Sequence, residues 1–220
     1  MKKILCSTIL ATMMFMSVGS YAQNVYTNEQ VKPCGNELVC TLNEKLLTGI
    51  VKGFYPNGNL WSETTYKNGK PDGWRKEYYE NGNLQFETTF KDGKQEGLSK
   101  GYYPNGNLEG EGTFKDGKPE GLWKEYYENG NLKDEITYKG GKQDGWRKIY
   151  YENGNLKVEG TFKDGKAEGL SKGYYPNGNL AEEVLFKKGE AISGFMYDIF
   201  GKKTPMTNAH LYNMMKDLKF

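Results

Sequence analysis

The sequence predicts an all-β protein, an elongated single-layer antiparallel β-meander of about six hairpin repeats followed by a short C-terminal capping helix. Three observations support this prediction. A unit that begins at Gly73 begins again at Gly97, 24 residues later; each unit contains two strand-like stretches; and each stretch ends at a glycine-containing turn motif. A fixed period of this length is typical of stacked-repeat proteins, in which each unit packs mainly against its neighbours.

The first turn motif of each unit is an Asn-Gly pair. Asn-Gly between two strand-like stretches is a strong hairpin signal, because a type I′ turn needs positive φ at both central residues. We expect residues 76–79 and 84–90 to pair around such a turn, and Lys91-Asp92-Gly93-Lys94 to return the chain to the next strand. The pairs are Asn57-Gly58, Asn81-Gly82, Asn105-Gly106, Asn129-Gly130, Asn153-Gly154 and Asn177-Gly178.

If the loop has two residues, the register of each hairpin is fixed. The residue numbers of every pair across one hairpin then add up to the same value. This register places Lys76 opposite Glu87, and Gly73 opposite Phe90, whose ring is expected to cover the glycine backbone. Every unit has a pair of opposite charges at this position, which supports the register. The further charge pairs are Lys52–Glu63, Lys100–Glu111, Lys124–Glu135, Lys148–Glu159 and Lys172–Glu183, and the further glycine pairs are Gly49–Tyr66 and Gly121–Tyr138.

Residues 1–22 have the pattern of an export signal peptide. Lys2 and Lys3 form the charged end, residues 4–18 form a short apolar stretch, and Ser20-Tyr21-Ala22 offers a small-x-small cleavage site. The alternative is an uncleaved membrane anchor, which the short apolar stretch disfavours. We expect an exported protein that is periplasmic, cell-surface or secreted, with no transmembrane segment after signal cleavage.

Residues 23–48 fit no repeat and are expected to form an N-terminal cap, because the first unit of a stack has no preceding neighbour. Cys34 and Cys40 lie here, and the third cysteine lies in the signal peptide. An even pair in an exported chain favours a disulfide over a metal or catalytic site. A bond across this short loop would stabilise the cap by roughly 2–3 kcal/mol.

The repeat array is expected to occupy residues 49–194, and residues 195–220 are expected to form a degenerate repeat and a C-terminal capping helix. Thr207 is the predicted N-cap of this helix, with Met206 and Leu211 at the spacing of a hydrophobic staple. We expect the helix to cover the exposed edge of the last strand, with a partner-binding helix as the alternative. Its apolar stripe consists of Leu211, Met214, Met215 and Leu218.

Alternation along the strands assigns Tyr79, Leu84 and Phe90 to a packed face, and Trp74 and Tyr78 to the other face. Two interpretations of the second face stay open. Its rings either pack across strands within the sheet or form an aromatic strip that contacts a ligand. The candidate binding residues are Phe54, Trp74, Tyr78, Tyr102, Tyr126, Trp146, Tyr150 and Tyr174.

The sequence offers little for catalysis, and we expect no enzyme, no catalytic residues, no cofactor and no metal site. His210 is the only histidine, which excludes multi-histidine metal sites. Glu87 and Glu111 are one repeat apart and each is expected to pair with a lysine, which favours a structural role over an acid–base pair. The Gly-x-Gly motif at residues 110–112 lies inside a predicted strand and is therefore no phosphate-binding loop.

Charge also excludes some partners. Of the 30 basic residues, Lys2 and Lys3 belong to the signal peptide, so 28 remain beside 28 acidic residues. These charges alternate along the strands and form neither the basic footprint of a nucleic-acid-binding protein nor a polybasic patch for anionic lipid.

The units resemble the MORN-variant repeat, whose pattern is approximately Y-x-x-G-x-L followed by Y/F-K-x-G-x-x-x-G. The matching residues are Tyr79 to Leu84 (YENGNL), Phe90 to Lys94 (FKDGK) and Gly97. The resemblance covers about residues 49–194. It implies the repeat fold and a role in scaffolding, dimerisation or membrane attachment, and it implies no catalytic residue. Bacterial relatives are often labelled antitoxin components, a label that the predicted export signal does not fit.

Together these features predict an exported, non-enzymatic repeat scaffold or adhesin-like module. We expect it to bind another protein through its repeated aromatic face or a sheet edge, and a homo-oligomer stays open. Binding of cell-wall glycan or choline through the repeated aromatics is one alternative. An antitoxin component of a toxin–antitoxin pair is the other.

Overall fold

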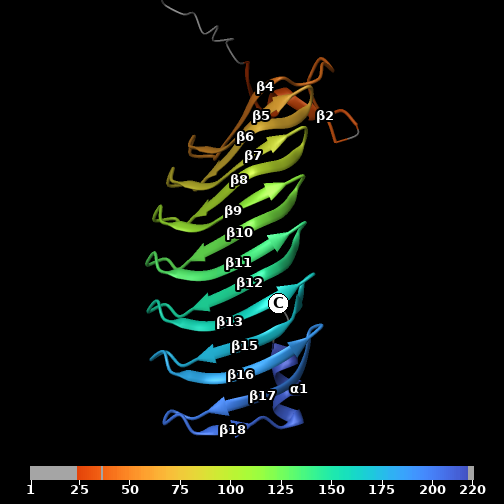
Figure 1. Cartoon of the computed structure of the whole chain (residues 1–220). Coiled ribbons are helices and arrows are strands. Elements are labelled where there is room, and N and C mark those ends of the chain that lie inside the picture. Colours follow the sequence, from red (N-terminus) through yellow and green to blue (C-terminus); the bar gives the residue numbers. More distant parts are fainter. Residues whose placement is uncertain (1–23, 36, 218–220) are drawn as a thin grey trace, which may run out of the picture.

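The protein is an elongated single-layer sheet in a computed structural model that describes residues 24–35 and 37–217. The strands follow one another in chain order along the length of the molecule (Figure 1). Within the described residues, 16 strands belong to this sheet and two more form a small separate sheet. The predicted all-β meander is therefore confirmed. The predicted signal peptide, residues 1–22, lies outside the described residues.

Each repeat contributes two antiparallel strands to the sheet. Residue 168 interrupts one of them, so that β14 (Lys166–Ala167) pairs with β13 separately from β15. The strands of the meander are β4 (Gly49–Phe54), β5 (Leu60–Lys67), β6 (Lys70–Tyr78), β7 (Leu84–Lys91), β8 (Lys94–Tyr102), β9 (Leu108–Lys115), β10 (Lys118–Tyr126), β11 (Leu132–Lys139), β12 (Lys142–Tyr150), β13 (Leu156–Lys163), β15 (Gly169–Tyr174), β16 (Leu180–Lys187) and β17 (Glu190–Tyr197).

The N-terminal end of the stack is closed by the segment that precedes the repeats. Strand β1 (Val25–Thr27) pairs in parallel with β4, and a 3₁₀ turn at Asn28–Gln30 leads into the small sheet of β2 (Val31–Pro33) and β3 (Val39–Thr41). The predicted disulfide is present between Cys34 and Cys40, whose Cα atoms are 5.7 Å apart. Leu47 is fully buried here, which gives this end a small apolar core.

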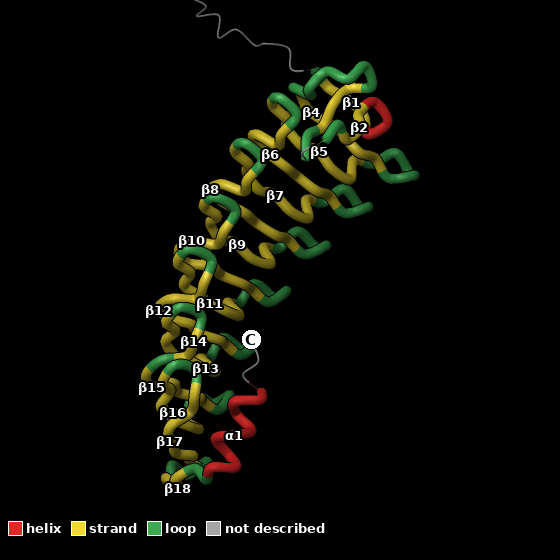
Figure 2. The backbone as a smooth tube through the Cα atoms, turned by 90° about the vertical axis from the view of Figure 1, so that its right-hand side faces the viewer, coloured by secondary structure: helices red, strands yellow, loops and turns green. Residues whose placement is uncertain are grey.

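The C-terminal end is closed in a different way from the one predicted. Strand β18 (Lys203–Pro205) pairs with β17 and covers its edge, so the helix does not do so. Helix α1 (Asn208–Asp217) instead lies alongside one face of the stack (Figure 2). The prediction was wrong because the short segment before the helix supplies the missing ladder hydrogen bonds, whereas a helix has no free backbone groups to offer a strand edge.

The start of α1 agrees with the sequence pattern. The Thr207 hydroxyl accepts a hydrogen bond from the backbone N–H of His210 at 3.3 Å, as an N-cap does. Leu211 is buried against Val184 and Phe186, with Met206 packed beside them. The side chains of Met214, Met215 and Leu218, predicted to extend this stripe, lie outside the described residues.

The Asn-Gly turns are not type I′. At the second of them, the backbone N–H of Tyr79 donates to the carbonyl of Asn83 and that of Gly82 donates to the carbonyl of Tyr79, both at 2.8 Å. The φ angle is positive at Gly82 but not at Asn81, whose side chain accepts a hydrogen bond from the N–H of Asn83 at 3.0 Å. This is a three-residue loop, a type I turn followed by a left-handed glycine. The asparagine side chain stabilises the right-handed conformation at its own position.

The type I′ geometry occurs at the other end of the hairpins. Asp92 and Gly93 have φ angles of 50° and 87°, and Lys91 pairs with Lys94. The two-residue turn with positive φ at both central residues is therefore the motif that sequence reasoning treated as a simple return. Asparagine, aspartate and glycine tolerate this region better than other residues do.

The predicted register holds in the middle of each hairpin and slips by one residue near the longer loop. Lys76 pairs with Glu87 and Gly73 with Phe90, as expected. Tyr78, however, pairs with Leu84, so Gln85 is an extra residue. The constant sum of residue numbers expected from the sequence would have paired Leu84 with Tyr79, and this part of the prediction is wrong. A three-residue loop followed by a bulge accounts for the shift.

The glycine at the start of each unit has a different role from the one predicted. At Gly73 a Cβ atom would meet Thr65 at 3.1 Å rather than the ring of Phe90, and at Gly121 it would meet open space. Both residues have positive φ, 112° and 77°, where the strand bulges. The backbone conformation, not an aromatic cover, therefore requires glycine here.

Neighbouring repeats are tied together at both ends of the strands. At the longer loop, the hydroxyl of Tyr103 donates to the carbonyl of Tyr126 at 2.7 Å, and the side-chain amide of Asn107 donates to the carbonyl of Glu128 at 2.9 Å. At the two-residue turn, the carboxylate of Glu96 accepts from the backbone N–H of Asp116 at 2.8 Å. Tyr55, Tyr79, Tyr127, Tyr151 and Tyr175 make the same hydroxyl contact as Tyr103.

The elongated shape can be tested in solution by small-angle scattering. Fifteen consecutive strands about 4.8 Å apart give a stack roughly 65–70 Å long, whereas a compact globule of about 200 residues has a radius of gyration near 16 Å. We expect a measured value clearly above that. A value at the globular limit would rule out the single-layer stack.

Loss of one inter-repeat hydroxyl is expected to destabilise the stack. Tyr103→Phe keeps the ring but leaves the carbonyl of Tyr126 without its partner, and we expect the free energy of unfolding to fall by about 1 kcal/mol. Urea unfolding followed by circular dichroism measures the change. Phe114→Leu, which alters apolar contacts without removing a hydroxyl, is the control, and an unchanged midpoint for Tyr103→Phe would show that the hydrogen bond contributes nothing.

Candidate interaction face

One face of the sheet carries a continuous row of alternating charges, and we call it the ladder face. Lys76 pairs with Glu63 on one side and with Glu87 on the other, and Glu87 pairs in turn with Lys100. The row runs across the meander from Lys52 to Glu183 without an interruption in its alternation. All the charge pairs predicted from the sequence are therefore neighbours in the sheet.

These pairs are close but not tightly bonded. The ammonium and carboxylate groups of Lys52–Glu63, Lys100–Glu111 and Lys124–Glu135 are 3.8 Å apart, and their side chains keep between a quarter and about a third of their exposure. Pairs of this kind contribute little stability each. Their regular alternation leaves the ladder face without a long-range field of one sign.

A row of tyrosines borders the ladder on the side of the longer loops. The hydroxyl of Tyr78 donates to the carboxylate of Glu63, and each later tyrosine donates to the glutamate of the preceding repeat in the same way. The O–O distances range from 2.6 to 3.4 Å. The tyrosine row comprises Tyr78, Tyr102, Tyr126, Tyr150, Tyr174 and Tyr197.

Burial and the neighbouring glutamates raise pKa values in the tyrosine row. Burial, reinforced by the charge and hydrogen bond of Glu63, raises the pKa of Tyr78 to about 12. Burial and Glu87 raise the pKa of Tyr102 to about 12 as well. A phenol has a single O–H, so a tyrosine that already donates to a carboxylate cannot donate to a ligand as well.

An exposed apolar row borders the ladder on its other side. Trp74 is 53% exposed and Trp146 is 56% exposed, and three leucines at the same position of other repeats are 46–50% exposed. Trp74 pairs across strands with Thr89, and the Lys76 ammonium lies 6.0 Å from the centre of the Trp74 ring. The apolar row comprises Trp74, Leu98, Leu122, Trp146 and Leu170.

The candidate binding residues therefore fall into two separate rows. Trp74 and Trp146 lie in the apolar row, whereas the five predicted tyrosines lie in the tyrosine row across the ladder. Phe54 occupies the tyrosine position of the first repeat, pairs with Leu60 and is 50% exposed. The structure does not bring these residues into one pocket; it arranges them in rows along one face of the sheet.

Sequence reasoning missed the leucines of the apolar row. Leu98, Leu122 and Leu170 each follow the glycine that opens a unit, as Trp74 does. This shared position in the 24-residue period was the signal that could have placed the leucines in one row with Trp74. Leucine is so commonly buried that its repetition alone did not mark a surface.

The opposite face is more closely packed. It holds Thr88 and Ser99, which are almost fully buried, and the ring of Trp123, which stands edge-on to Phe114 at 5.6 Å. Arg147 donates to the carboxylate of Asp134 at 2.7 Å in a largely buried pair. Burial raises the pKa of Asp134, and the hydrogen bond and charge of Arg147 oppose this shift.

The described residues offer no metal site and no membrane-spanning helix. They contain no cluster of at least three histidine, cysteine, aspartate or glutamate residues arranged to hold a metal ion. No helix among them has the length and apolar character needed to cross a bilayer. His210 lies in the first turn of α1 and contacts Thr207.

A scan against family models supplies the family. The MORN repeat variant model matches six segments, residues 47–68, 71–92, 95–116, 119–139, 143–164 and 167–188, which together cover more than half of the chain. The chain belongs to the MORN repeat variant family. MORN repeats generally serve as non-catalytic scaffolds for interaction with proteins or membranes. No curated protein matches the chain.

The matched segments correspond to the hairpins of the meander. The five later MORN segments begin just after a two-residue turn, and every matched segment includes a longer loop with its Asn-Gly pair. The residues that define the repeat are therefore those that make the turns and the contacts between repeats. The exposed positions of the apolar row are left free to vary between tryptophan and leucine.

The tyrosine row predicts a specific alkaline instability. Tyr78, Tyr102, Tyr150 and Tyr174 have pKa values raised from 10 to about 12, so between these pH values the unfolded chain loses phenol protons that the native chain keeps. Stability should therefore fall as the pH rises from 10 to 12. Replacing these four tyrosines by phenylalanine should make that fall shallower, as measured by urea unfolding at several pH values.

Lysines also titrate in this pH range, but they do so equally in the wild type and in the fourfold variant, so their effect cancels when the two slopes are compared. Tyr55→Phe combined with Tyr127→Phe is a suitable control, because these hydroxyls bond to backbone carbonyls rather than to carboxylates. Equal slopes for the wild type and the fourfold variant would show that the tyrosine–glutamate contacts do not govern the alkaline transition.

Proposed function

We propose that this protein is an exported, non-enzymatic scaffold or adhesin-like module that binds another protein through its ladder face. The observation that carries the proposal is the apolar row, in which the five side chains Trp74, Leu98, Leu122, Trp146 and Leu170 stand half-exposed at intervals of one repeat. Large apolar side chains on a soluble surface are favoured contact points for partners, and tryptophan is enriched among the residues that dominate binding energy.

The spacing of the row defines the kind of partner that fits it. Each repeat adds two strands, so neighbouring side chains of the row are about 9–10 Å apart along the stack. Each side chain alone offers a small contact, and several engaged together bind by avidity. An extended partner surface with apolar groups at several points along its length satisfies this arrangement better than a small compact ligand does.

The charge ladder beside the row supports a partner without strong net charge. Because lysine and glutamate alternate at every strand, attraction and repulsion nearly cancel beyond a few ångströms. Recognition then depends on short-range contact and on correct alignment along the ladder. Polar groups of a partner that match the alternation would fix its position relative to the repeats.

Two observations favour the apolar row over the tyrosine row as the source of the principal contacts. The hydroxyls of Tyr78 and Tyr102 are bonded to glutamates, and their rings are less exposed than those of Trp74 and Trp146. We therefore propose that the tryptophans and leucines make the principal contacts. The tyrosines hold the glutamates in place and form the border of the surface.

Export is part of this proposal. It is supported by the signal-like sequence of residues 1–22 and by the Cys34–Cys40 disulfide, since disulfides persist mainly in oxidising compartments. N-terminal sequencing of the protein recovered from cells tests it directly. A mature chain that begins near residue 23 is expected, and an intact Met1 terminus would count against export by this route.

The binding surface is tested by crosslinking in intact cells with the tagged protein as bait. The variant Trp74→Ser, Leu122→Ser, Trp146→Ser should keep its melting temperature within a few degrees, because these side chains are half-exposed, and should lose most of its captured partner. The control variant Tyr78→Phe, Tyr126→Phe, Tyr150→Phe should retain the partner, since each ring stays in place.

Three other outcomes would contradict the proposal. Equal capture by the serine variant would show that the apolar row is not the binding surface. Recovery of glycan fragments in place of a protein would favour the binding of cell-wall glycan or choline. If the phenylalanine variant lost the partner and the serine variant kept it, the tyrosine row would be the binding surface.

A further inference from the structure

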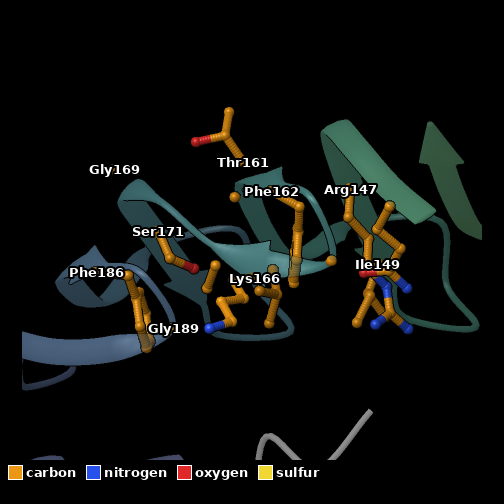
Figure 3. A pocket seen from close by; sticks show the side chains of 14 residues that line it. Arg147, Ile149, Thr161, Phe162, Lys166, Gly169, Ser171, Phe186 and Gly189 are labelled. Carbon is orange, nitrogen blue, oxygen red and sulfur yellow. The ribbon is translucent and has the colours of Figure 1, made fainter. Parts of the chain in front are cut away.

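The opposite face is hollowed near its C-terminal end. The hollow has a volume of about 300 Å³ and lies between β12 and β16, on the side of the sheet toward which Phe162, Lys166 and Phe186 point (Figure 3). Ile149 and Val158 complete its apolar wall, and Ser171 contributes a small polar group. The side chain of Thr161 points to the other side of the sheet (Figure 3).

Two small residues, Gly160 and Ser171, lie side by side in the wall of the hollow. In the row of cross-strand neighbours on this face, Gly160 pairs with Arg147 on one side and is followed by Ser171, 3.1 Å from where a glycine Cβ would stand. Two repeats earlier the corresponding glycine, Gly112, is covered by the ring of Trp123. Ser171 stands beside Gly160 where Trp123 stands beside Gly112, so no ring covers Gly160 from that side.

Helix α1 already packs on one wall of this hollow. Leu211 is buried against Phe186, and Ala167 is packed against the same cluster. Phe186 and Ala167 also line the hollow, so the helix contact and the hollow share residues. Figure 2 shows α1 rising alongside the sheet from β18 toward the middle of the stack, the direction in which the hollow lies.

The chain that follows α1 is within reach. From Leu211 to Asp217 the helix advances about 9 Å, close to two strand spacings, which carries its end from the level of β16 toward β13 and β15. Three further residues, Leu218-Lys219-Phe220, can extend roughly 10 Å beyond that. Two of the three are large and apolar, and match the apolar wall.

We propose that residues 218–220 dock in this hollow and that the Phe220 ring fills the space left at Gly160. The contact continues the α1 interface without a break. It connects the C-terminal helix to β12 and β13, two repeats before the end of the array, rather than to the last repeat alone. The hollow is then an internal docking site of the chain, and the ladder face is the surface that stays open to partners.

Cysteine trapping tests the proposal in the whole protein. A cysteine at Leu218, Lys219 or Phe220 is combined in turn with Lys166→Cys at the rim of the hollow, and Cys6→Ser removes the cysteine that is not part of the native disulfide. A disulfide forms only if the Cα atoms come within about 4.4–6.8 Å, so at least one of the three pairs should form an intramolecular bond under mild oxidation. Peptide mapping without reductant identifies it.

The repeat supplies a matched control. Lys94 occupies the position of Lys166 three repeats earlier, it is likewise exposed, and the sequences from Gly97 and from Gly169 that follow the two turns are identical over twelve residues. The Lys94→Cys pairs lie roughly 29 Å from the hollow and should form no bond. Equal yields at positions 94 and 166, or no bond in any of the three pairs, would overturn the proposal.

A second variant separates docking from mere proximity. Gly160→Leu fills the hollow from within the sheet at a position that is not restricted to glycine by positive φ. When this change is added to the Lys166→Cys pairs, the yield of the trapped bond should fall at least several-fold while the circular dichroism spectrum of the sheet is retained. Undiminished trapping would show that the segment passes over the hollow without entering it.

Discussion

The stack depends on hydrogen bonds that one repeat makes to the backbone of the next. At the longer loops, Tyr103 and Asn107 donate to the carbonyls of Tyr126 and Glu128 in the following repeat. At the two-residue turns, Glu96 accepts from the backbone of Asp116. None of these contacts exists within an isolated hairpin, so each repeat is stable only beside another. The two ends of the array therefore need β1 and β18 to satisfy their open edges.

This dependence explains how a sheet without a second layer remains folded. Only a few described side chains, among them Leu47, Thr88, Ser99 and Val184, are almost fully buried. A single layer cannot bury both of its faces, and the hydrophobic contribution per residue is correspondingly small. Regular contacts between neighbours, each worth about 0.5–1.5 kcal/mol, replace the central core of a globular domain. Because each repeat contacts only its neighbours, such a protein can gain or lose whole repeats and keep the same fold.

The two faces differ because the residues that hold the repeats together occupy only some positions of the unit. The turns, the tyrosines and the charge ladder fix the geometry, and the position of Trp74 and its copies takes no part in it. That position is therefore free to carry the exposed apolar groups of the proposed binding surface. On the opposite face the same freedom leaves a hollow where Gly160 and Ser171 meet, beside the helix that ends the chain.

Much of the architecture followed from the sequence alone, because the 24-residue period, the alternation and the charge pairs each constrain neighbouring strands directly. Lys76 opposite Glu87 and the Cys34–Cys40 bond needed no knowledge of distant parts of the chain. The turn types, the bulge at Gln85 and the position of α1 required the tertiary structure. The Asn81 side chain decides one turn type through its bond to Asn83, and β18 competes with the helix for the edge of β17. Exposure of the apolar row was likewise undetermined by sequence, since whether a leucine is covered depends on what packs above the sheet, and period and alternation carry no information about that.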